Sequence, residues 1–340
     1  MFADTLIAGP CAAESPEQVL RTAEAIAAQH LPVGQTIYRA GLWKPRSAPN
    51  SFQGVGEEGL PWLLRVRQDY GMPVATEVAT PEQVRLCMDA GIDYLWIGAR
   101  TAANPIAVQE LADTLHGCLQ QSDKRLRGVW VKNPMHEDSR LWEGNIARVQ
   151  QAVTGTDVAV WAVHRGCNHR PCWDMAYQLH KNLPDIPLLL DASHMAGDAG
   201  LIAELLAQGA ALHYNGCMLE THIHPQQALS DAQQQITPTQ LAEIWNHIPL
   251  PDGRQPLDLR WLRAMMDETD DDLCAMINRR MTVSRRIGEL KRRLNIPVVQ
   301  PERFRQVLEQ RKARGRQYNI SEQCIESVYE ALHQESIRKQ

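Results

Sequence analysis

The sequence predicts an α/β protein with a (β/α)8 (TIM) barrel, followed by a small all-α domain of three helices that dimerises. Three observations predict this fold class. Eight short apolar runs alternate with amphipathic segments up to about residue 245, a proline-rich stretch follows, and the rest has only a helical period. A doubly wound open sheet is the alternative that the alternation allows. At 340 residues, the chain is long enough for two domains.

The apolar runs are rich in β-branched residues, as expected for strands that are buried on both faces. They are residues 5–9, 36–40, 73–78, 93–98, 128–132, 158–164, 187–191 and 211–220. The segments between them begin and end like helices. Residues 15–17 (Ser-Pro-Glu) and 80–82 (Thr-Pro-Glu) each place an N-cap before a first-turn proline, and Gly91 ends the second segment.

The predicted barrel domain comprises residues 1–246. Residues 247–257 contain three prolines and a glycine without periodicity, which predicts an interdomain linker. The helical domain then comprises residues 258–340, with helices expected at 262–294, 301–312 and from 321 to the C-terminus. Three such helices cannot bury their apolar faces alone, so we expect a homo-oligomer of at least two chains.

Composition limits the location and the partners. No apolar run reaches the roughly 18 residues of a membrane span, and the start lacks the basic region of a secretory signal, so we expect a cytoplasmic protein without membrane contact. The eight cysteines show no CxxC spacing and are expected to be reduced thiols. Residues 257–340 carry 17 Lys and Arg against 13 Asp and Glu, an excess too small and too interleaved to predict nucleic-acid binding.

Polar or charged residues stand at the ends of all the expected strands, where barrels of this class carry their catalytic residues. They are Cys11, Arg39, Lys44, Arg46, Glu77, Arg100, Lys132, His164, Arg165, His194, Glu220 and Asp231. Any single cation among them is also compatible with an ordinary surface position. Together the cations would repel one another, so we expect small substrates that carry phosphate and carboxylate groups.

Four of these residues offer a mixed set of metal donors: Cys11, His194, Glu220 and Asp231. Sulfur, nitrogen and oxygen donors together favour a divalent transition metal over Mg²⁺ or Ca²⁺. His222 and His224 are alternative imidazole donors. Strand alternation points Glu220 and His222 the same way, so His222 stays open as a ligand.

The long predicted helix carries two cations within its apolar face. At about 100° per residue, the buried stripe is expected to consist of Leu273, Met276, Ile277, Ser284, Ile287 and Leu294. Arg280 and Lys291 fall inside this stripe. Because unpaired buried cations are costly, we expect an anionic ligand or an internal carboxylate beside them. Long side chains that extend to solvent are the alternative.

Motifs in a fixed order identify a family for the first 245 residues. They are GPC (9–11), KPRS (44–47), IGAR (97–100), VK (131–132), HRG (164–166), DASH (191–194), MLETHIHP (218–225) and SDAQQQ (230–235). Together they resemble type I 3-deoxy-D-arabino-heptulosonate 7-phosphate (DAHP) synthase, in the branch that also contains the 3-deoxy-octulosonate 8-phosphate synthases. The KPRS motif resembles that of the members that use erythrose 4-phosphate.

The resemblance implies roles for individual residues. Phosphoenolpyruvate would be surrounded by Arg39, Lys44, Arg100, Lys132, Arg165 and His194. Erythrose 4-phosphate would lie against Lys44, Pro45, Arg46 and Ser47, with Arg46 at its phosphate. Cys11, His194, Glu220 and Asp231 would bind a metal of the Mn²⁺, Fe²⁺, Co²⁺ or Zn²⁺ type, and the catalytic residues would be Lys132, His194 and Cys11. Ala232 departs from the glycine that usually follows the aspartate ligand.

The implied reaction joins C3 of phosphoenolpyruvate to the aldehyde carbon of erythrose 4-phosphate, adds water at C2 and expels phosphate. The cations would orient phosphoenolpyruvate and the metal would polarise the aldehyde. Lys132 and water are both candidates for handling the proton.

Residues 257–340 resemble the all-helical chorismate mutases, which would make the chain a bifunctional shikimate-pathway enzyme. The matching positions are Arg263, Arg280, Lys291, Arg303, Ser336 and Gln340. The resemblance implies an intertwined dimer that rearranges chorismate to prephenate, with Arg263 reaching into the partner's site. Gln300 and Phe304 depart from the usual aspartate and glutamate, which would weaken the contact to the substrate hydroxyl.

Two alternatives make different predictions. If the tail is only a dimerisation module or a nucleic-acid-binding element, the isolated fragment 257–340 forms no prephenate, and in the second case it binds RNA in a salt-sensitive way. If the aldose is arabinose 5-phosphate, phosphate release will require that sugar. The pairing of two activities, without a regulatory extension before the first strand, also predicts that the mutase ligand modulates the synthase.

Overall fold

A computed structural model of the chain describes residues 4–44, 51–121, 125–248 and 255–339. Contacts divide the chain into two compact units, Met1–Met265 and Met266–Gln340, and each unit is described by itself. Among the described helices, none combines the length and the apolar character that a membrane crossing requires.

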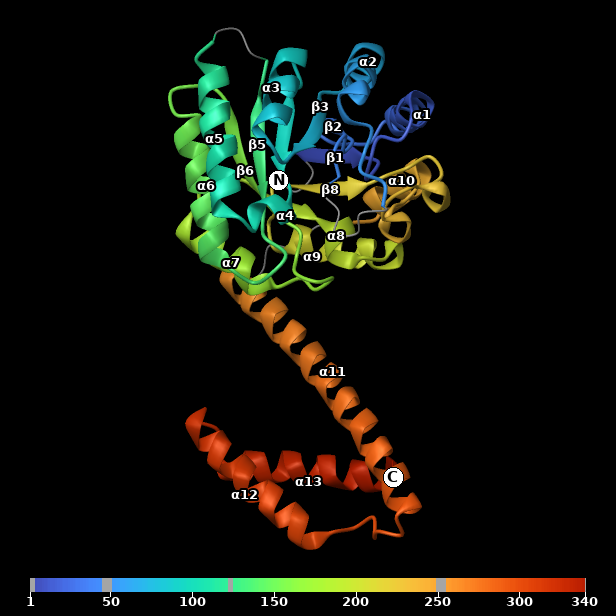
Figure 1. The fold of residues 1–340 in the computed structure, drawn as a ribbon, viewed down its shortest axis with the longest axis vertical. Coiled ribbons are helices and arrows are strands. Elements are labelled where there is room, and N and C mark those ends of the chain that lie inside the picture. The colour runs from blue at the N-terminus through green and yellow to red at the C-terminus, as the bar shows by residue number, and fades with distance from the viewer. Residues whose placement is uncertain (1–3, 45–50, 122–124, 249–254, 340) are drawn as a thin grey trace. The chain divides into compact units, whose positions relative to one another are not determined.

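Within the described part of the first unit, eight parallel strands form a closed barrel in the order of the sequence. They are β1 (Thr5–Gly9), β2 (Gln35–Arg39), β3 (Val74–Val78), β4 (Tyr94–Ile97), β5 (Gly128–Lys132), β6 (Ala159–His164), β7 (Leu188–Asp191) and β8 (Gly216–Glu220). Because β1 pairs with β8, the predicted barrel is confirmed and the open sheet is excluded. Figure 1 shows helices arranged around the strands.

The helices of the first unit begin largely where the sequence signals predict. They are α1 (Pro16–Ala27), α2 (Leu60–Tyr70), α3 (Pro81–Ala90), α4 (Ala99–Ala102), α5 (Pro105–Leu119), α6 (Ser139–Ala152), α7 (Trp173–Asn182), α8 (Ala192–Ala196), α9 (Ile202–Ala211) and α10 (Pro238–Asn246). The Ser15 side chain accepts a hydrogen bond from the N–H of Gln18, and Thr80 caps α3 in the same way. Gly91 ends α3 with φ of 77°.

The eighth strand begins later than its apolar run predicts. Residues 211–220 contain the last residue of α9, a turn and the whole of β8. His213 lies in the turn with φ of 60°, while Leu212 and Tyr214 are buried without being part of the strand. Apolar content alone could not separate the end of the helix from the beginning of the strand.

The interior of the barrel is filled by stacked aromatic rings. Tyr94 and Trp96 of β4 point into the barrel, whereas Leu95 and Ile97 of the same strand pack in the outer layer against the helices. The ring of Trp130 lies 5.1 Å from that of Tyr94 and 6.5 Å from that of Trp96, measured between centroids. The barrel is therefore a packed core, and any site lies at its ends.

Barrel closure brings the beginning and the end of the first unit together. Gly9 of β1 pairs with Glu220 of β8. Gly9 has φ of 147°, and a Cβ at this position would lie 2.0 Å from the carbonyl oxygen of Arg39, so a side chain cannot be accommodated. As a result, Cys11 follows β1 directly beside the end of β8.

The first turns of α11 (Leu257–Arg293) belong to the first unit. Trp261 in these turns is 1% exposed, and its ring centroid lies 5.8 Å from that of Tyr214 and 6.2 Å from that of Trp173. This aromatic contact anchors the helix beside β8 and α7. The helix that begins the predicted second domain at residue 258 is thus packed on the first unit through its first turns.

The second unit contains the rest of α11, together with α12 (Pro301–Gln317) and α13 (Glu322–Lys339). Three helices confirm the predicted all-helical region. α12 continues beyond its predicted end at Lys312, because Gly315 lies inside the helix instead of ending it. A Cβ at Gly315 would lie 2.6 Å from Cγ1 of Ile325, so the glycine permits the close approach of α12 and α13.

The apolar stripe predicted on α11 is largely exposed in a single chain. The exposed fractions of Leu273, Met276, Ile287 and Leu294 lie between 45% and 59%. Ser284, from the same predicted stripe, is buried. The prediction of a buried stripe is therefore wrong for one chain by itself, because α12 and α13 cover only part of this face.

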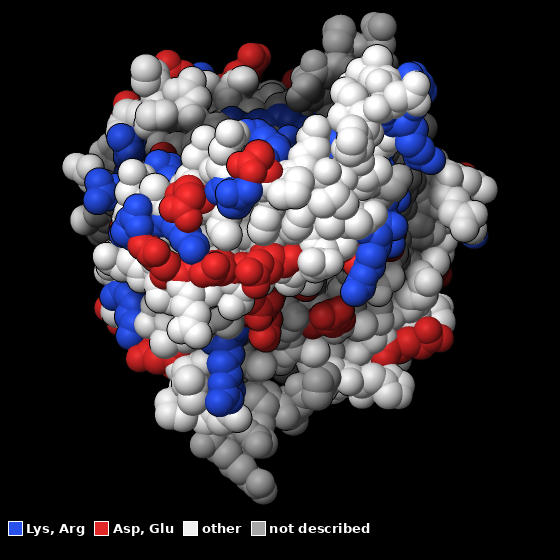
Figure 2. Space-filling view, turned by 90° about the horizontal axis from the view of Figure 1, so that it is seen from below, with Lys and Arg blue, Asp and Glu red and all other residues white. Residues whose placement is uncertain are grey.

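Charged side chains of both signs are interspersed on the face that Figure 2 shows. A band of acidic side chains separates small groups of basic ones, with uncharged residues between them. On this face, the described residues form no continuous basic stripe of the kind that follows a nucleic-acid backbone.

Candidate functional site

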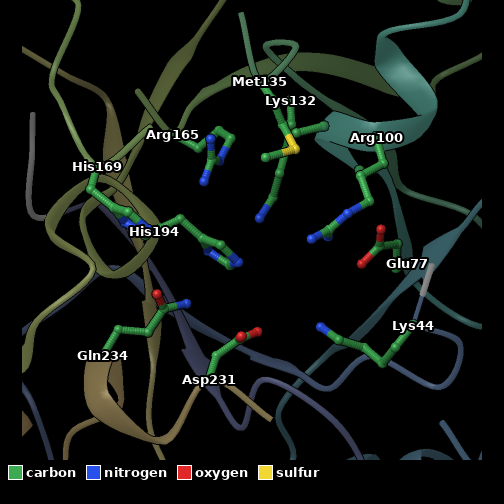
Figure 3. Close-up of a pocket in the computed structure, with 12 residues that line it drawn as sticks. Lys44, Glu77, Arg100, Lys132, Met135, Arg165, His169, His194, Asp231 and Gln234 are labelled. Carbon is green, nitrogen blue, oxygen red and sulfur yellow. The ribbon is translucent and has the colours of Figure 1, made fainter. Parts of the chain in front are cut away.

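A cavity of about 170 Å³ lies at the C-terminal ends of the barrel strands. Its lining consists of Lys44, Glu77, Gly98, Ala99, Arg100, Lys132, Met135, Arg165, His169, His194, Asp231 and Gln234. Figure 3 shows the side chains of Lys44, Arg100, Lys132 and Arg165 directed toward one shared space. Four cations from four strand ends therefore meet at one opening. Pro45, Arg46 and Ser47 lie outside the described residues.

Arg39 does not line this cavity, although the resemblance places it against the substrate. Its side chain is 1% exposed, with Nη1 3.3 Å from Oε1 of Glu220. Its Nη2 donates a hydrogen bond of 3.0 Å to the carbonyl oxygen of Cys11. The guanidinium thus contributes its charge from within the barrel wall instead of from the cavity surface.

Asp191, at the end of β7, joins Lys132 to His194. Its Oδ2 lies 2.5 Å from Nζ of Lys132, and its Oδ1 lies 3.0 Å from Nδ1 of His194. Burial opposes the charge of Asp191, but His194 and Lys132 outweigh this effect and hold its pKa well below the usual range. Burial lowers the pKa of both Lys132 and His194. The contact to Asp191 leaves Nε2 of His194 for another partner, 3.6 Å from Oε1 of Glu220.

Three of the four predicted metal donors converge beside Asp191 and His194, and the fourth, His194, approaches the group through its contact with Glu220. One donor atom each of Cys11, Glu220 and Asp231 lies within 4.8 Å of the others. Oε1 of Glu220 is buried and has no hydrogen-bond partner among the described residues, although Arg39 and His194 stand nearby. A buried carboxylate oxygen left in this state fits a bound cation. The four donors are therefore compatible with a divalent transition metal.

The thiol of Cys11 is buried beside charged groups that shift its pKa. Burial, followed by the Glu220 carboxylate, raises the pKa of Cys11 to about 12, although the Lys44 ammonium opposes this shift. Nζ of Lys44 lies 3.0 Å from the sulfur. The thiol is therefore protonated at neutral pH, and binding of a metal to this sulfur would require loss of that proton.

Two glutamines orient the donors, and the sequence did not predict their roles. Nε2 of Gln234 donates to Oε2 of Glu220 at 2.8 Å. Oε1 of Gln235 accepts from the N–H of Cys11 at 3.0 Å. Asp191 was likewise missed as an orienting residue. The available signals were the SDAQQQ motif that contains both glutamines and the position of Asp191 at a strand end.

His222, one of the alternative histidine ligands, is directed to partners outside the donor group. His222 is 3% exposed, its Nδ1 accepts from the N–H of His224 at 2.8 Å, and its Nε2 lies 3.7 Å from Oε2 of Glu14. The geometry therefore favours His194 as the imidazole donor over His222 and His224.

His164 also lies away from the cavity, contrary to the expectation that it belongs to the rim. Its ring is fully buried among Trp142, Trp173 and Tyr214, and Nδ1 lies 2.8 Å from the Tyr214 hydroxyl. Burial, followed by the Arg165 charge, lowers the pKa of His164 to about 3. Because neighbouring strand positions face opposite sides, His164 points to the outer layer while Arg165 reaches the cavity.

The second unit contains a larger cavity of about 890 Å³ between its helices. Its charged and polar lining comprises Arg279, Arg280, Ser284, Lys291, Gln300, Arg303, Arg311, His333 and Ser336. No Asp or Glu is among the described residues that line it, and the rest of the lining is apolar or aromatic. A compact anion with an apolar ring fits this combination.

The two cations predicted inside the apolar face of α11 have neutral partners. Nη1 of Arg280 donates to Oγ of Ser336 at 2.6 Å, and Nζ of Lys291 donates to the carbonyl oxygen of Val298 at 2.6 Å. The sequence left open an internal carboxylate as the partner of these cations, but no Asp or Glu is among the described residues that line the cavity. The two charges are therefore available to an anionic ligand.

Two predicted mutase residues are not part of this lining. Arg263 belongs to the first unit, where its Nη1 donates to Oε1 of Gln255 at 2.7 Å, so its proposed role in a partner's site stays a prediction. Gln340 lies outside the described residues. Phe304, at a position that departs from the family pattern, stacks on His333 with ring centroids 4.0 Å apart.

Comparison with known proteins matches both units to families. Residues 3–248 match the DAHP synthetase I family, and residues 262–340 match chorismate mutase type II. The Thermotoga maritima phospho-2-dehydro-3-deoxyheptonate aldolase is 28% identical over 246 residues, which cover 68% of this chain and 65% of that protein. The chain thus spans about two thirds of this relative's length.

Other relatives carry a different name. The Wolinella succinogenes 2-dehydro-3-deoxyphosphooctonate aldolase is 26% identical over 263 residues, covering 69% of this chain and 94% of that protein. Among solved structures, the Thermotoga maritima DAHP synthase crystal structure has a TM-score of 0.60 at 25% identity, covering 72% of this chain and 67% of that one.

Proposed function

The chain belongs to the DAHP synthetase I family and carries a chorismate mutase type II domain, and from this we propose that it condenses phosphoenolpyruvate with erythrose 4-phosphate and also rearranges chorismate to prephenate. One observation carries the first activity. Four cations line one cavity at the C-terminal end of the barrel, and the cluster of metal donors reaches this cavity through Asp231.

The cations of the cavity suit phosphoenolpyruvate, which carries a phosphate and a carboxylate. Arg100 and Arg165 offer planar forks for these oxyanions, and Lys132 offers a point charge. We assign these three residues to phosphoenolpyruvate and Lys44 to the boundary with the aldose. The resemblance assigns Arg46 to the phosphate group of erythrose 4-phosphate, but Arg46 lies outside the described residues.

Enzymes of this family depend on a metal ion, and the donors present fit one. We assign Cys11, His194, Glu220 and Asp231 as its ligands and expect an ion of the Mn²⁺, Fe²⁺, Co²⁺ or Zn²⁺ type. When bound, the ion would polarise the aldehyde carbonyl as a Lewis acid. Gln234 and Gln235 then keep the Glu220 and Cys11 groups aimed at the same point.

The side chains of the cavity account for orientation and proton handling. The fixed cations present C3 of phosphoenolpyruvate to the aldehyde carbon, so that the new C–C bond forms in an oriented pair. Water then adds at C2, and inorganic phosphate leaves. Lys132 holds a proton at its Nζ, which Asp191 keeps in place, and is our candidate for protonating the developing alkoxide.

The test offers phosphoenolpyruvate with either erythrose 4-phosphate or arabinose 5-phosphate and measures phosphate release by the full chain. We expect release with erythrose 4-phosphate only, and its loss after chelation until metal is restored. Release only with arabinose 5-phosphate would assign the chain to the second activity, which the names of several relatives suggest. Release with neither aldose would reject the synthase proposal.

The cavity of the second unit supports the mutase proposal. Arg280, Lys291 and Arg303 would bind the two carboxylates and the ether oxygen of chorismate, and no nucleophile is needed for the rearrangement. Prephenate formation by the full chain tests this assignment. A chain that binds RNA and forms no prephenate would support the alternative of a nucleic-acid-binding tail.

We also propose that the chain forms a homodimer through the exposed apolar residues of α11. Light scattering on the purified chain tests this, and a monomer at micromolar concentration would reject it. Modulation of the synthase by the mutase ligand is a further proposal, which unchanged synthase rates at saturating prephenate and chorismate would reject. The cytoplasmic location stays a prediction from the sequence.

A further inference from the structure

The indole ring of Trp96 contacts two buried cations of the synthase site. Cζ of Arg39 lies 4.7 Å from the ring centroid, and Nζ of Lys132 lies 5.9 Å from it. All three side chains are at most 5% exposed, so little solvent screens these contacts. We propose that Trp96 is a positioning residue, whose ring face holds Lys132 at the cavity for phosphoenolpyruvate and Arg39 in the buried layer behind it. This inference rests on the proposed synthase function.

Each of the two cations also pairs with a carboxylate, and each carboxylate has a second partner or role. Arg39 pairs with Glu220, but Glu220 is also a proposed metal ligand, so its negative charge is shared with the metal. Lys132 pairs with Asp191, which also holds His194. Arg39 and Lys132 both contact the ring of Trp96. Unlike Glu220, this ring is not a proposed metal ligand. It offsets the repulsion between two buried positive charges.

The ring of Trp96 lies in a stack of rings inside the barrel and makes no hydrogen bond through its indole nitrogen among the described residues. Its plane lies at 14° to that of Trp130, with centroids 6.5 Å apart. Trp130 in turn stacks on Tyr94 and Trp161. Nε1 of Trp96 is buried and has no hydrogen-bond partner among the described residues. The indole N–H of Trp96 therefore has no hydrogen-bonding role among the described residues of the site, and the cations lie against the face of its ring.

Trp130 offers a matched control within the same stack. It has the same size and the same burial as Trp96, and it fills the same barrel interior. The cation contacts in the described structure involve Trp96 and not Trp130. Replacing Trp130 therefore removes a comparable amount of packing without removing a partner of Arg39 or Lys132.

The experiment compares Trp96→Leu, Trp96→Phe and Trp130→Leu in the full chain loaded with metal. The dissociation constant of phosphoenolpyruvate is measured by calorimetry, together with kcat, the KM of both substrates and the melting temperature. We expect Trp96→Leu to weaken phosphoenolpyruvate binding by roughly ten-fold. The KM of phosphoenolpyruvate should rise by a similar factor in this variant, while the KM of the aldose changes less than about two-fold.

The two other variants separate positioning from packing. Trp96→Phe keeps a weaker ring face and should recover binding to within about three-fold of the unsubstituted chain. Trp130→Leu should lower the melting temperature about as much as Trp96→Leu but change phosphoenolpyruvate binding by less than about two-fold. If Trp96→Leu does not fold, Trp96→Phe is compared with Trp130→Phe instead. Trp96→Phe should then weaken phosphoenolpyruvate binding more than Trp130→Phe does.

Equal weakening by the Trp96 and Trp130 variants would overturn the inference, as would unchanged binding by Trp96→Leu. If the unsubstituted chain itself does not bind phosphoenolpyruvate, the proposed function falls instead. The variants are then compared with inorganic phosphate as the probe. Weaker phosphate binding by Trp96→Leu than by Trp130→Leu would support the positioning role, and equal binding would overturn it.

Discussion

The sulfur of Cys11 lies 2.9 Å from Oδ2 of Asp231, although 220 residues separate them in the chain. Glu220 joins them because its strand, β8, pairs with the strand that precedes Cys11. His194 reaches the same group from the end of β7, with Nε2 3.6 Å from Glu220. The donor set is therefore assembled by the closing of the barrel and not by any local motif.

Cys11→Ser should weaken metal binding by at least about 100-fold, because a hydroxyl is a poor substitute for the thiolate among soft donors. The thiolate-to-metal absorption band of the Co²⁺-loaded chain should also disappear. Calorimetry and absorption spectra with Co²⁺ measure both effects. The exposed Cys274→Ser is the control and should leave them unchanged. A Cys11→Ser chain with unaltered Co²⁺ affinity would remove Cys11 from the ligand set.

Asp191→Asn should lower kcat/KM of the synthase by about 100-fold, because the charge that fixes Lys132 and His194 is lost. The buried Lys132 then lacks its counter-charge at 2.5 Å. Steady-state kinetics with both substrates measures the effect. Asp185→Asn, at an exposed position before β7, is the control. If both variants keep kcat/KM within about three-fold of the unsubstituted chain, Asp191 has no orienting role.

The stability of the first unit should fall as the pH drops below the usual pKa of histidine, because His164 is buried in its neutral form. The pKa of His164 is about 3 in the folded chain, against 6.5 for an ordinary histidine, so the unfolded chain binds the proton first as the pH falls. Above pH 6.5, His164 is neutral in both the folded and the unfolded chain, so it does not lower the free energy of unfolding. Below pH 6.5, the free energy of unfolding falls by up to about 1.4 kcal/mol per pH unit, until the pH reaches the pKa of His164 in the folded chain.

His164→Phe removes this titration and keeps an aromatic ring in the same cage. Denaturant unfolding measures the free energy of unfolding between about pH 6.5 and pH 4. Its slope against pH should therefore correspond to one proton fewer in this variant than in the unsubstituted chain. Tyr214→Phe is the control, because it removes the hydroxyl partner but leaves the histidine to titrate. An identical slope in His164→Phe and the unsubstituted chain would show that another group dominates the acid response.

Arg280→Met should lower prephenate formation by about 100-fold or more, because it removes a cation from the proposed chorismate cavity. It also breaks the hydrogen bonds to Ser336 and to the carbonyl oxygen of Leu332. Chorismate consumption and prephenate formation are measured in the full chain. Arg292→Met removes a charge from an exposed position of the same helix and should change the rate less than about two-fold. Equal rates in both variants would place the mutase site elsewhere.

The barrel could be predicted from the sequence because its strands and helices repeat a local pattern eight times. Residue spacing also indicated which side chains would stand at the strand ends, since parallel strands all end on the same side. The direction of single side chains was harder to predict. His164 and Arg165 are neighbours in sequence, yet one is buried in the outer layer and the other lines the cavity.

Other features depend on contacts that a sequence does not display. Arg39 was expected against the substrate, but it is buried against Glu220 and Trp96 because the interior of the barrel offers it an ion pair and a ring. The apolar stripe on α11 was expected to be buried, but covering it requires more surface than one chain supplies. The helix expected at 301–312 extends to Gln317, and Gly315 within it allows two helices to approach each other.

The pairing of β1 with β8 has a consequence for how a new molecule matures. Cys11 leaves the ribosome early, whereas Glu220 and Asp231 are among the last parts of the barrel to be translated. With the proposed ligand set, a nascent chain cannot hold the ion until β8 has paired with β1. Metal would then bind only after the barrel has been synthesised, so a newly made chain would start as apoprotein.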